Sequence, residues 1–255
     1  MAVKITCGDF YEGLGKTTTL AVFALLLQSQ NKKTLVIDFD PTAKLTKILE
    51  KKYNRRLQDF HLSVFESLQI GDLSVGITAL TFELDIIPSN NDFLTMPPIL
   101  FAKKPEHFLA DLLESIEAKY DFILMDLPSI QNIYTNHVYV AADYILPIVE
   151  PARISGQAFS NIIEEIETTV KRKNKKLKIL GIIESAFKLE TSYENFLTMR
   201  ICDKRVQKLM FSEMLHNGSL IYFWLNSKRS CEELKNIKYL ATFNILLEDI
   251  QKRLK

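Results

Sequence analysis

The chain has 255 residues, of which 47% are hydrophobic and 25% charged, and this near-average usage excludes a disordered or fibrous protein. Its 32 basic and 31 acidic residues give a net charge of +1, which argues against a uniformly basic nucleic-acid binder but leaves local patches open. Residues 1–170 carry 14 basic and 22 acidic side chains, whereas residues 171–255 carry 18 and 9. The near-neutral total therefore combines an acidic N-terminal portion with a basic C-terminal third.

Cysteine content and hydropathy indicate the compartment. Cys7, Cys202 and Cys231 are too few and too scattered for a disulfide framework, and no CxxC pair is present. The longest apolar run, Leu20–Leu27, is far shorter than the 18 or more residues that a membrane-spanning helix requires, and the N-terminus lacks the apolar core of a signal peptide. We therefore expect a cytoplasmic protein.

Short runs rich in Val, Ile and Leu alternate with amphipathic stretches along the chain. Continuous rather than alternating hydrophobicity is typical of strands that are covered on both faces. The predicted strands are 3–6, 34–39, 84–87, 122–125, 144–149 and 177–183, and the predicted helices include 17–29, 106–119, 155–169 and 232–254. This order predicts one α/β domain over residues 1–255, with three layers and a mostly parallel β-sheet flanked by helices. In such sheets ligands bind beyond the carboxyl ends of the strands.

A glycine-rich loop follows the first predicted strand and leads into the helix that starts near Thr17. Glycines allow a tight turn, and the amides at a helix N-terminus attract phosphate. Lys16 can neutralise β- and γ-phosphate charge, and the Thr17 hydroxyl can bind Mg²⁺. Phe10 replaces the first glycine of the general G-x-x-x-x-G-K-[ST] pattern. The segment Gly13-Leu14-Gly15-Lys16-Thr17-Thr18 still predicts a phosphate-binding loop, because it joins a strand to a helix.

Two later strands end in aspartates, Asp38 and Asp40 after the second strand and Asp126 after a later one. An acid at a strand end beside a phosphate loop can hold a water of the Mg²⁺ shell, and a second acid can orient the attacking water. Each aspartate alone is more often a capping or solvated residue. Together with Lys16 they predict a magnesium and nucleotide site, since all three segments converge on one edge of the sheet.

With these motifs the sequence resembles the ParA/MinD superfamily of deviant Walker A ATPases, and particularly the small ParA-type DNA partition proteins. The matching segments are 13–19, 37–41, 120–128 and 142–147. The resemblance implies a P-loop NTPase fold, ATP and Mg²⁺ as cofactors, a homodimer that binds nonspecific DNA on the nucleoid, and a centromere-binding adaptor protein that triggers release. It assigns ATP binding to Gly13, Leu14, Gly15, Lys16, Thr17 and Thr18, magnesium binding to Thr17, Asp38 and Asp126, and catalysis to Lys16 and Asp40.

The loop departs from this family at Tyr11 and Glu12, where the family normally has a signature lysine and a glycine. Loss of one positive charge and gain of a negative one near a triphosphate weaken stabilisation of the transition state. We therefore expect ATP binding with slow or absent hydrolysis. Two alternatives stay open. Glu12 turns outward while another basic residue substitutes, or the protein is a non-hydrolysing scaffold or regulator.

The basic C-terminal third is the candidate DNA surface. Residues 171–178 place six basic side chains in eight positions, although such runs are most often solvated loop charge. A patch that contacts phosphates alone gives sequence-independent, salt-sensitive affinity. The candidate DNA-binding residues are Arg200, Lys204, Arg205, Lys228 and Arg229.

The last predicted helix leaves a membrane alternative, because MinD-like relatives carry a terminal amphipathic helix that binds membranes. Its apolar residues Phe243, Leu246, Leu247, Ile250 and Leu254 recur at helical spacing. A helix packed on the domain explains this stripe as well or better, so membrane binding is not expected.

The single tryptophan, Trp224, is likewise predicted to pack in the core rather than to stack on bases.

Overall fold

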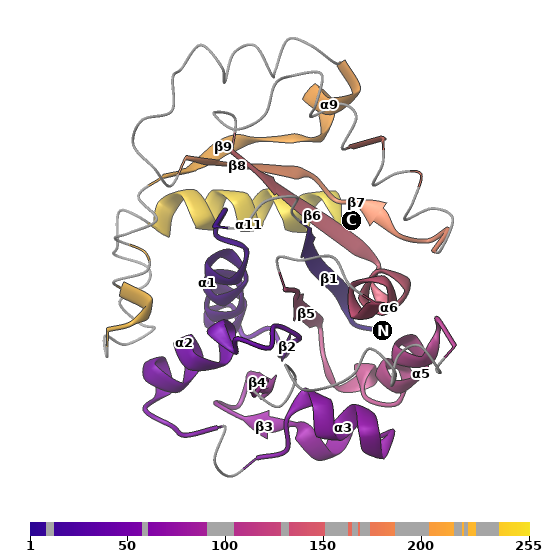
Figure 1. Cartoon of the computed structure of the whole chain (residues 1–255). Coiled ribbons are helices and arrows are strands. Elements are labelled where there is room, and N and C mark those ends of the chain that lie inside the picture. Colours follow the sequence, from indigo (N-terminus) through magenta and orange to yellow (C-terminus); the bar gives the residue numbers. More distant parts are fainter. Residues whose placement is uncertain are drawn as a thin grey trace.

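The computed structural model describes residues 1–8, 13–57, 61–90, 105–128, 133–150, 163–164, 168, 174–186, 204–216, 221, 224–227 and 240–255. Within these residues a central β-sheet lies between two layers of helices (Figure 1). The predicted three-layer α/β architecture is therefore confirmed.

The described strands form one nine-stranded sheet in the order β3-β4-β2-β5-β1-β6-β8-β9, and β7 also pairs with β6. All pairs are parallel except β3 with β4. The strands are β1 (Val3–Gly8), β2 (Thr34–Asp38), β3 (Thr78–Ala79), β4 (Leu84–Ile87), β5 (Phe122–Asp126), β6 (Tyr144–Val149), β7 (Lys178–Ile179), β8 (Ile182–Ala186) and β9 (Met210–His216).

The helices cover both faces because successive strand residues point to opposite sides. Val36 and Leu124 pack on one face with α1 and α11, whereas their neighbours Ile37 and Met125 pack on the other with α3, α5 and α6. The helices are α1 (Lys16–Ser29), α2 (Lys44–Tyr53), α3 (Val64–Ile70), α5 (Phe108–Glu114), α6 (Ile133–Ala141), α9 (Lys204–Leu209) and α11 (Ala241–Arg253), with 3₁₀ turns η1 (Leu73–Gly76) and η3 (Glu117–Lys119).

The predicted strand 177–183 is wrong as a single element, since it divides into β7 and β8. Nη1 of Arg253 donates to the carbonyl of Leu180 between them (3.1 Å) and so takes an acceptor that a continuous strand would use in the ladder. A Cβ at Gly181 would lie 2.5 Å from the Phe211 ring and would also meet this guanidinium. Glycine thus allows the α11 side chain to enter the break.

Two predicted helices are shorter than expected. The stretch 106–119 forms α5 and then η3, where Ser115 Oγ donates to the carbonyl of Leu112 (2.7 Å), a local bond that competes with helix continuation. The stretch 232–254 is described only from residue 240, and α11 spans Ala241–Arg253. The predicted helix 155–169 lies almost wholly outside the described residues. Strand β9 was not predicted.

Packing of α11 confirms that its apolar stripe belongs to the core. Phe243, Leu246, Leu247 and Ile250 are buried, and the Phe243 ring meets Phe23 of α1 edge to face with 5.9 Å between centroids. No helix among the described residues has the length and apolar character needed to span a membrane.

Trp224 is also a core residue, as predicted. It is 5% exposed, and the ammonium of Lys52, near the end of α2, lies 3.7 Å from the centre of its ring. This cation–π contact links α2 to the segment around residue 224.

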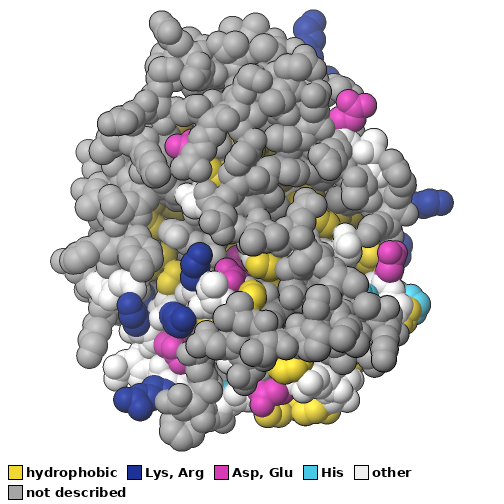
Figure 2. Space-filling view, viewed as in Figure 1, with side chains coloured by type: hydrophobic (Ala, Val, Ile, Leu, Met, Phe, Trp, Pro, Cys, Tyr) yellow, Lys and Arg dark blue, Asp and Glu magenta, His cyan; other side chains and the backbone are white. Residues whose placement is uncertain are grey.

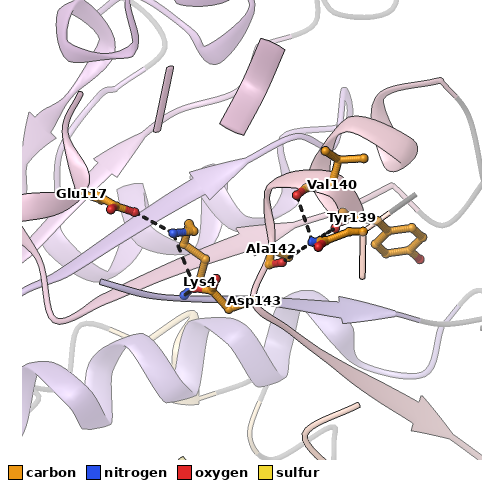
Figure 3. A network of polar contacts seen from close by, with 7 residues as sticks. Lys4, Glu117, Tyr139, Val140, Ala142 and Asp143 are labelled. Atoms are coloured by element: carbon orange, nitrogen blue, oxygen red, sulfur yellow. Dashed lines mark hydrogen bonds and ion pairs between the residues drawn. The ribbon is translucent and has the colours of Figure 1, made fainter. Parts of the chain in front are cut away.

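A buried ion pair fixes the start of the central strand β1. Lys4 Nζ lies 2.6 Å from Glu117 Oε2 and 3.5 Å from Asp143 Oδ2, which also accepts a hydrogen bond from the Lys4 amide (Figure 3). Burial alone would lower the pKa of Lys4, but the bond to Glu117 and the charge of Asp143 outweigh it and raise that pKa. The contacts of Lys4 therefore tie the start of β1 to η3 and to the residue before β6.

Candidate nucleotide site

The phosphate-binding loop ends in two glycines with left-handed backbone, Gly13 (φ 82°) and Gly15 (φ 89°). Because this region is unfavourable for side chains with a Cβ, glycine suits both positions. Gly15 is the N-cap of α1, and its carbonyl accepts the first hydrogen bond of the helix from Thr19 N (2.8 Å). The first turn of α1 has neither a side-chain cap nor an acidic residue. Its amides therefore point their partial positive charge toward the space beyond the loop, where an anion can bind.

The predicted nucleotide-binding residues divide between side chain and backbone. Lys16 begins α1 and is 6% exposed, while Leu14 is 2% exposed and belongs to the hydrophobic core. Leu14 can therefore serve a phosphate only through its backbone. Thr17 and Thr18 follow on the first turn and are half-buried.

The two strand-end carboxylates meet beside this turn. Asp38 of β2 and Asp126 of β5 are register partners, and both are fully buried. Thr17 Oγ1 donates a hydrogen bond of 2.8 Å to Asp126 Oδ2. The other oxygen, Asp126 Oδ1, is buried and has no hydrogen-bond partner among the described residues. The structure thus brings together Lys16, Thr17, Asp38 and Asp126, as the sequence predicts.

Burial makes both carboxyl groups hard to ionise. It raises the pKa of Asp126 well above its usual value, and the nearby charge of Asp38 raises it further. Burial also raises the pKa of Asp38 to about 6, although its hydrogen bonds with Thr46 oppose the shift. A divalent cation at this position would favour the ionised forms, because it neutralises two like charges.

Asp38 holds the start of α2. Its Oδ2 accepts hydrogen bonds from the Thr46 amide (2.9 Å) and hydroxyl (2.7 Å), and its Oδ1 accepts one from the Asp40 amide (3.0 Å). The Thr46 hydroxyl oxygen in turn accepts a bond from the Ser89 amide after β4 (3.0 Å). Sequence reasoning missed Thr46, because only the fold brings it back to the end of β2.

Asp40 lies in the turn between β2 and α2. Its Oδ1 accepts hydrogen bonds from the Thr42 amide (2.8 Å) and hydroxyl (2.7 Å), and the residue is 6% exposed. The turn ends at Ala43, which has a left-handed backbone with φ 52°. Such a conformation costs an alanine about 1–2 kcal/mol and is often found at functional turns. Asp40 therefore lies on a constrained turn beside the buried carboxylates.

These oxygen donors fit a magnesium–triphosphate complex. Mg²⁺ in proteins usually takes one or two carboxylates or hydroxyls and completes its octahedron with water and substrate phosphate. Thr17 Oγ1 keeps lone pairs while it donates to Asp126, and the unpartnered Asp126 Oδ1 can accept a metal-bound water. Within the described residues no cluster of three or more His, Cys, Asp or Glu side chains could hold a metal unaided. The Thr17 hydroxyl and the unpartnered Asp126 Oδ1 suit a cation that keeps water and phosphate as its other ligands.

Several predicted residues lie outside the described part of the chain. Tyr11 and Glu12 belong to residues 9–12, which the structure does not describe. Arg200, Lys228 and Arg229 also lie outside the described residues. Of the other DNA-binding candidates, Lys204 is exposed at the start of α9, and for Arg205 only the helical backbone is described.

Comparison with known proteins shows the family and the fold of the chain. Residues 3–179 match the family model AAA_31, an AAA domain. A virulence plasmid ParA family protein of Chlamydia psittaci, pGP5-D, is 28% identical over 249 residues, 90% of each chain. An McdA–ATP complex from Cyanothece superimposes with a TM-score of 0.79 at 19% identity, over 99% of this chain and 96% of that one. Cobyrinic acid a,c-diamide synthase from Mycobacterium smegmatis, solved with an ATP analog and magnesium, gives a TM-score of 0.79 at 17% identity, over 100% and 96%. At these identities the two structures show a shared fold.

Proposed function

Because the chain belongs to the AAA_31 family and with it to the ParA/MinD superfamily of P-loop ATPases, we propose that it is an ATP-dependent DNA partition protein that works as one ATPase domain. The observation that carries the proposal is the meeting of the Thr17 hydroxyl with the buried Asp126 at the start of α1. A hydroxyl, a carboxylate and open helix amides at one point suit Mg²⁺ and a triphosphate together.

Each residue has a role in this proposal. The amides of residues 13–18 and the Lys16 ammonium bind the phosphates, and Thr17 binds the magnesium ion, whose water shell Asp38 and Asp126 support. Bound magnesium neutralises charge on the β- and γ-phosphates. Asp40 orients the attacking water from its constrained turn.

We expect hydrolysis to be slow because of Tyr11 and Glu12. Replacing both, Tyr11→Lys with Glu12→Gly, restores a cation and removes a carboxylate, so phosphate release should rise at least tenfold. If wild type already releases phosphate quickly and the double variant adds nothing, the reasoning about this loop is wrong. No release from wild type, even with DNA and an adaptor present, would instead favour a nucleotide-binding scaffold.

Binding of ATP is proposed to drive homodimerisation and nonspecific DNA binding on the nucleoid, and a centromere-binding adaptor would trigger release. The support is the similarity to ParA family proteins and the basic C-terminal third. Charge reversal at Lys204, Arg205, Lys228 and Arg229 should abolish DNA retention while ATP binding continues. A membrane role gains no support from α11, since its apolar stripe is buried.

The nucleotide site has a direct test. Thr17→Ala should weaken Mg²⁺-dependent binding of a fluorescent ATP analog at least tenfold, and Thr17→Ser should restore most of it, because serine keeps the hydroxyl that contacts Asp126. Equal affinity of wild type and Thr17→Ala in excess Mg²⁺ would contradict the proposed magnesium site.

A further inference from the structure

Thr46 lies on the buried face of α2, between Asp38 and the chain that follows β4. We propose that Thr46 is a positioning residue for the proposed magnesium site, and that through it the chain after β4 governs how tightly the site holds a divalent cation. Its hydroxyl bonds to Asp38 and to the Ser89 amide, so it acts through Asp38 rather than on the ligand. The inference rests on the function proposed above and adds to it a control of cation affinity from outside the site.

The start of α2 explains why Thr46 meets Asp38. The N-cap of α2 is Ala43, whose side chain cannot accept a hydrogen bond, so the amides of the first helical turn need another acceptor. Thr46 is the third residue of the helix, and its amide donates to Asp38 Oδ2 (2.9 Å) where an N-cap side chain ordinarily accepts. The carboxylate of Asp38 therefore replaces the missing cap.

The amphipathic pattern of α2 turns Thr46 toward the sheet. Lys44, Lys47 and Lys51 are exposed on the other side of the helix, whereas Thr46 is fully buried. Figure 2 shows dark blue side chains at the lower left, where Figure 1 shows α2. The polar contacts of Thr46 therefore lie inside the protein, away from solvent.

The hydroxyl of Thr46 is oriented by its two partners. The Ser89 amide donates to Thr46 Oγ1 at 3.0 Å, and because an amide N–H can only donate, the hydroxyl oxygen must accept there. The single hydroxyl proton is then directed to Asp38 Oδ2 at 2.7 Å. All three residues are fully buried, and linked hydrogen bonds strengthen one another in such surroundings. The carboxylate of Asp38 is thus held by a bond that depends on the place of Ser89.

The two carboxylates of the site are each held by one threonine. Within the described chain, Asp38 Oδ2 accepts hydrogen bonds only from Thr46, and Oδ1 accepts one from the Asp40 amide. Its register partner Asp126 accepts from Thr17 of α1 (2.8 Å). Thr17 is proposed to bind the ion itself, whereas Thr46 fixes only the direction of Asp38. Residues that orient the groups of a metal site in this way are typically worth about 10–100-fold in metal affinity.

Ser89 connects this contact to α3. It lies just after β4, the neighbour of β2 in the sheet. The carbonyl of Pro88 accepts a hydrogen bond from the amide of Val64, the first residue of α3 (2.7 Å). A shift of Pro88 and Ser89 relative to β2 would therefore alter the bond to Thr46 and with it the hold on Asp38. Coupling of this kind is carried by contiguous buried contacts.

The first test compares binding of a fluorescent ATP analog by the full chain in excess Mg²⁺ and in EDTA. Thr46→Val keeps the β-branched shape and removes the hydroxyl, and we expect it to weaken binding at least tenfold with Mg²⁺ but less than threefold in EDTA. Thr46→Ser keeps the hydroxyl and should bind within about threefold of wild type in both conditions. A role in folding alone would not separate the two conditions.

Thr34→Val is the matched control for this test. Thr34 is fully buried at the amino end of β2, the strand that also carries Asp38, and its hydroxyl donates to the Lys32 carbonyl (2.9 Å). The control removes a buried hydroxyl from the same strand without touching Asp38. It should therefore change neither affinity by more than about threefold.

The second test follows the route in the wild-type protein by amide hydrogen exchange. Mg²⁺ with the analog should slow exchange of the Ser89 and Val64 amides at least threefold, because an occupied site holds the Thr46 contact in place. The Asp121 amide, which donates to a carbonyl at the opposite edge of the sheet (2.7 Å), should not change. In Thr46→Val saturated with the analog, the slowing at Ser89 should disappear.

Three outcomes would overturn the inference and leave the proposed function standing. The first is unchanged Mg²⁺-dependent affinity in Thr46→Val, and the second is an equal loss with Mg²⁺ and in EDTA. The third is exchange at Ser89 that does not respond to Mg²⁺ and the analog in wild type, a result that needs no folded variant. A wild-type protein that binds the analog neither with Mg²⁺ nor in EDTA would instead refute the proposed function itself. Thermal unfolding confirms that each variant is folded.

Discussion

Replacing Asp126 with asparagine is expected to stabilise the nucleotide-free protein while it removes the site's response to Mg²⁺ and ATP. Asp126 and Asp38 are fully buried register partners, and burial raises the pKa of each. A carboxyl group with a raised pKa in the folded state contributes stability that is fully present below its unfolded pKa and is lost as the pH rises through the folded value. Burial of these two carboxyl groups therefore lowers the stability of the nucleotide-free protein as the pH rises from acidic values.

The magnitude follows from Asp38. Its pKa rises from 3.8 to about 6, and each pKa unit is worth about 1.4 kcal/mol. Asp38 alone thus lowers the free energy of unfolding by about 3 kcal/mol between about pH 4 and pH 7. Asp126 adds to this loss with the same sign. An asparagine side chain at this position would carry no charge and could still accept the hydrogen bond from Thr17, so we expect Asp126→Asn to be more stable than wild type at pH 7.5 and to gain almost nothing near pH 4.

Urea unfolding in EDTA, followed from pH 4 to pH 8, measures this difference. Glu114→Gln is the control, because it replaces an exposed carboxylate at the end of α5 and should leave the pH profile unchanged. Mg²⁺ with ATP should stabilise wild type but not Asp126→Asn, since a ligand stabilises the folded state only if it binds there. An Asp126→Asn protein no more stable than wild type at pH 7.5, or one whose gain persists at pH 4, would refute the reasoning.

Two further substitutions test how the sheet is held together. Gly181→Ala should cost about 1–3 kcal/mol of unfolding free energy in urea, because its Cβ would displace the Arg253 guanidinium, and an unchanged midpoint would show that the break between β7 and β8 tolerates a side chain. Lys4→Met should cost about 3–5 kcal/mol by leaving Glu117 buried without a counter-charge, and adding Glu117→Leu should recover most of it. Fluorescence of Trp224, the single tryptophan, can report both unfolding transitions. If the Lys4 and Glu117 losses simply add, the two charges are not coupled.

Local sequence pattern was enough to predict the glycine turn before α1 and most strands of the sheet. The continuous apolar run at 144–149 became β6 with the predicted bounds, because a strand buried on both faces favours apolar residues. The run at 84–87 became β4 with the predicted bounds although it contains Asp85, whose carboxylate accepts a hydrogen bond from the Tyr120 hydroxyl (2.8 Å). Gly13, Gly15 and Lys16 could be proposed as phosphate-binding residues because the turn, the helix start and the charge are adjacent in sequence. Convergence of Asp38 with Asp126 was also predictable, since the carboxyl ends of parallel strands share one edge.

The sequence by itself therefore determined the α/β class, the family resemblance and the candidate residues of the nucleotide site. Only the tertiary structure decided the contacts between residues far apart in the chain: Ser89 on Thr46, Glu117 on Lys4, and Arg253 in the break before β8. These contacts depend on strand order and register, which arise from packing of the whole sheet, and no local periodicity encodes which distant segment a side chain will meet.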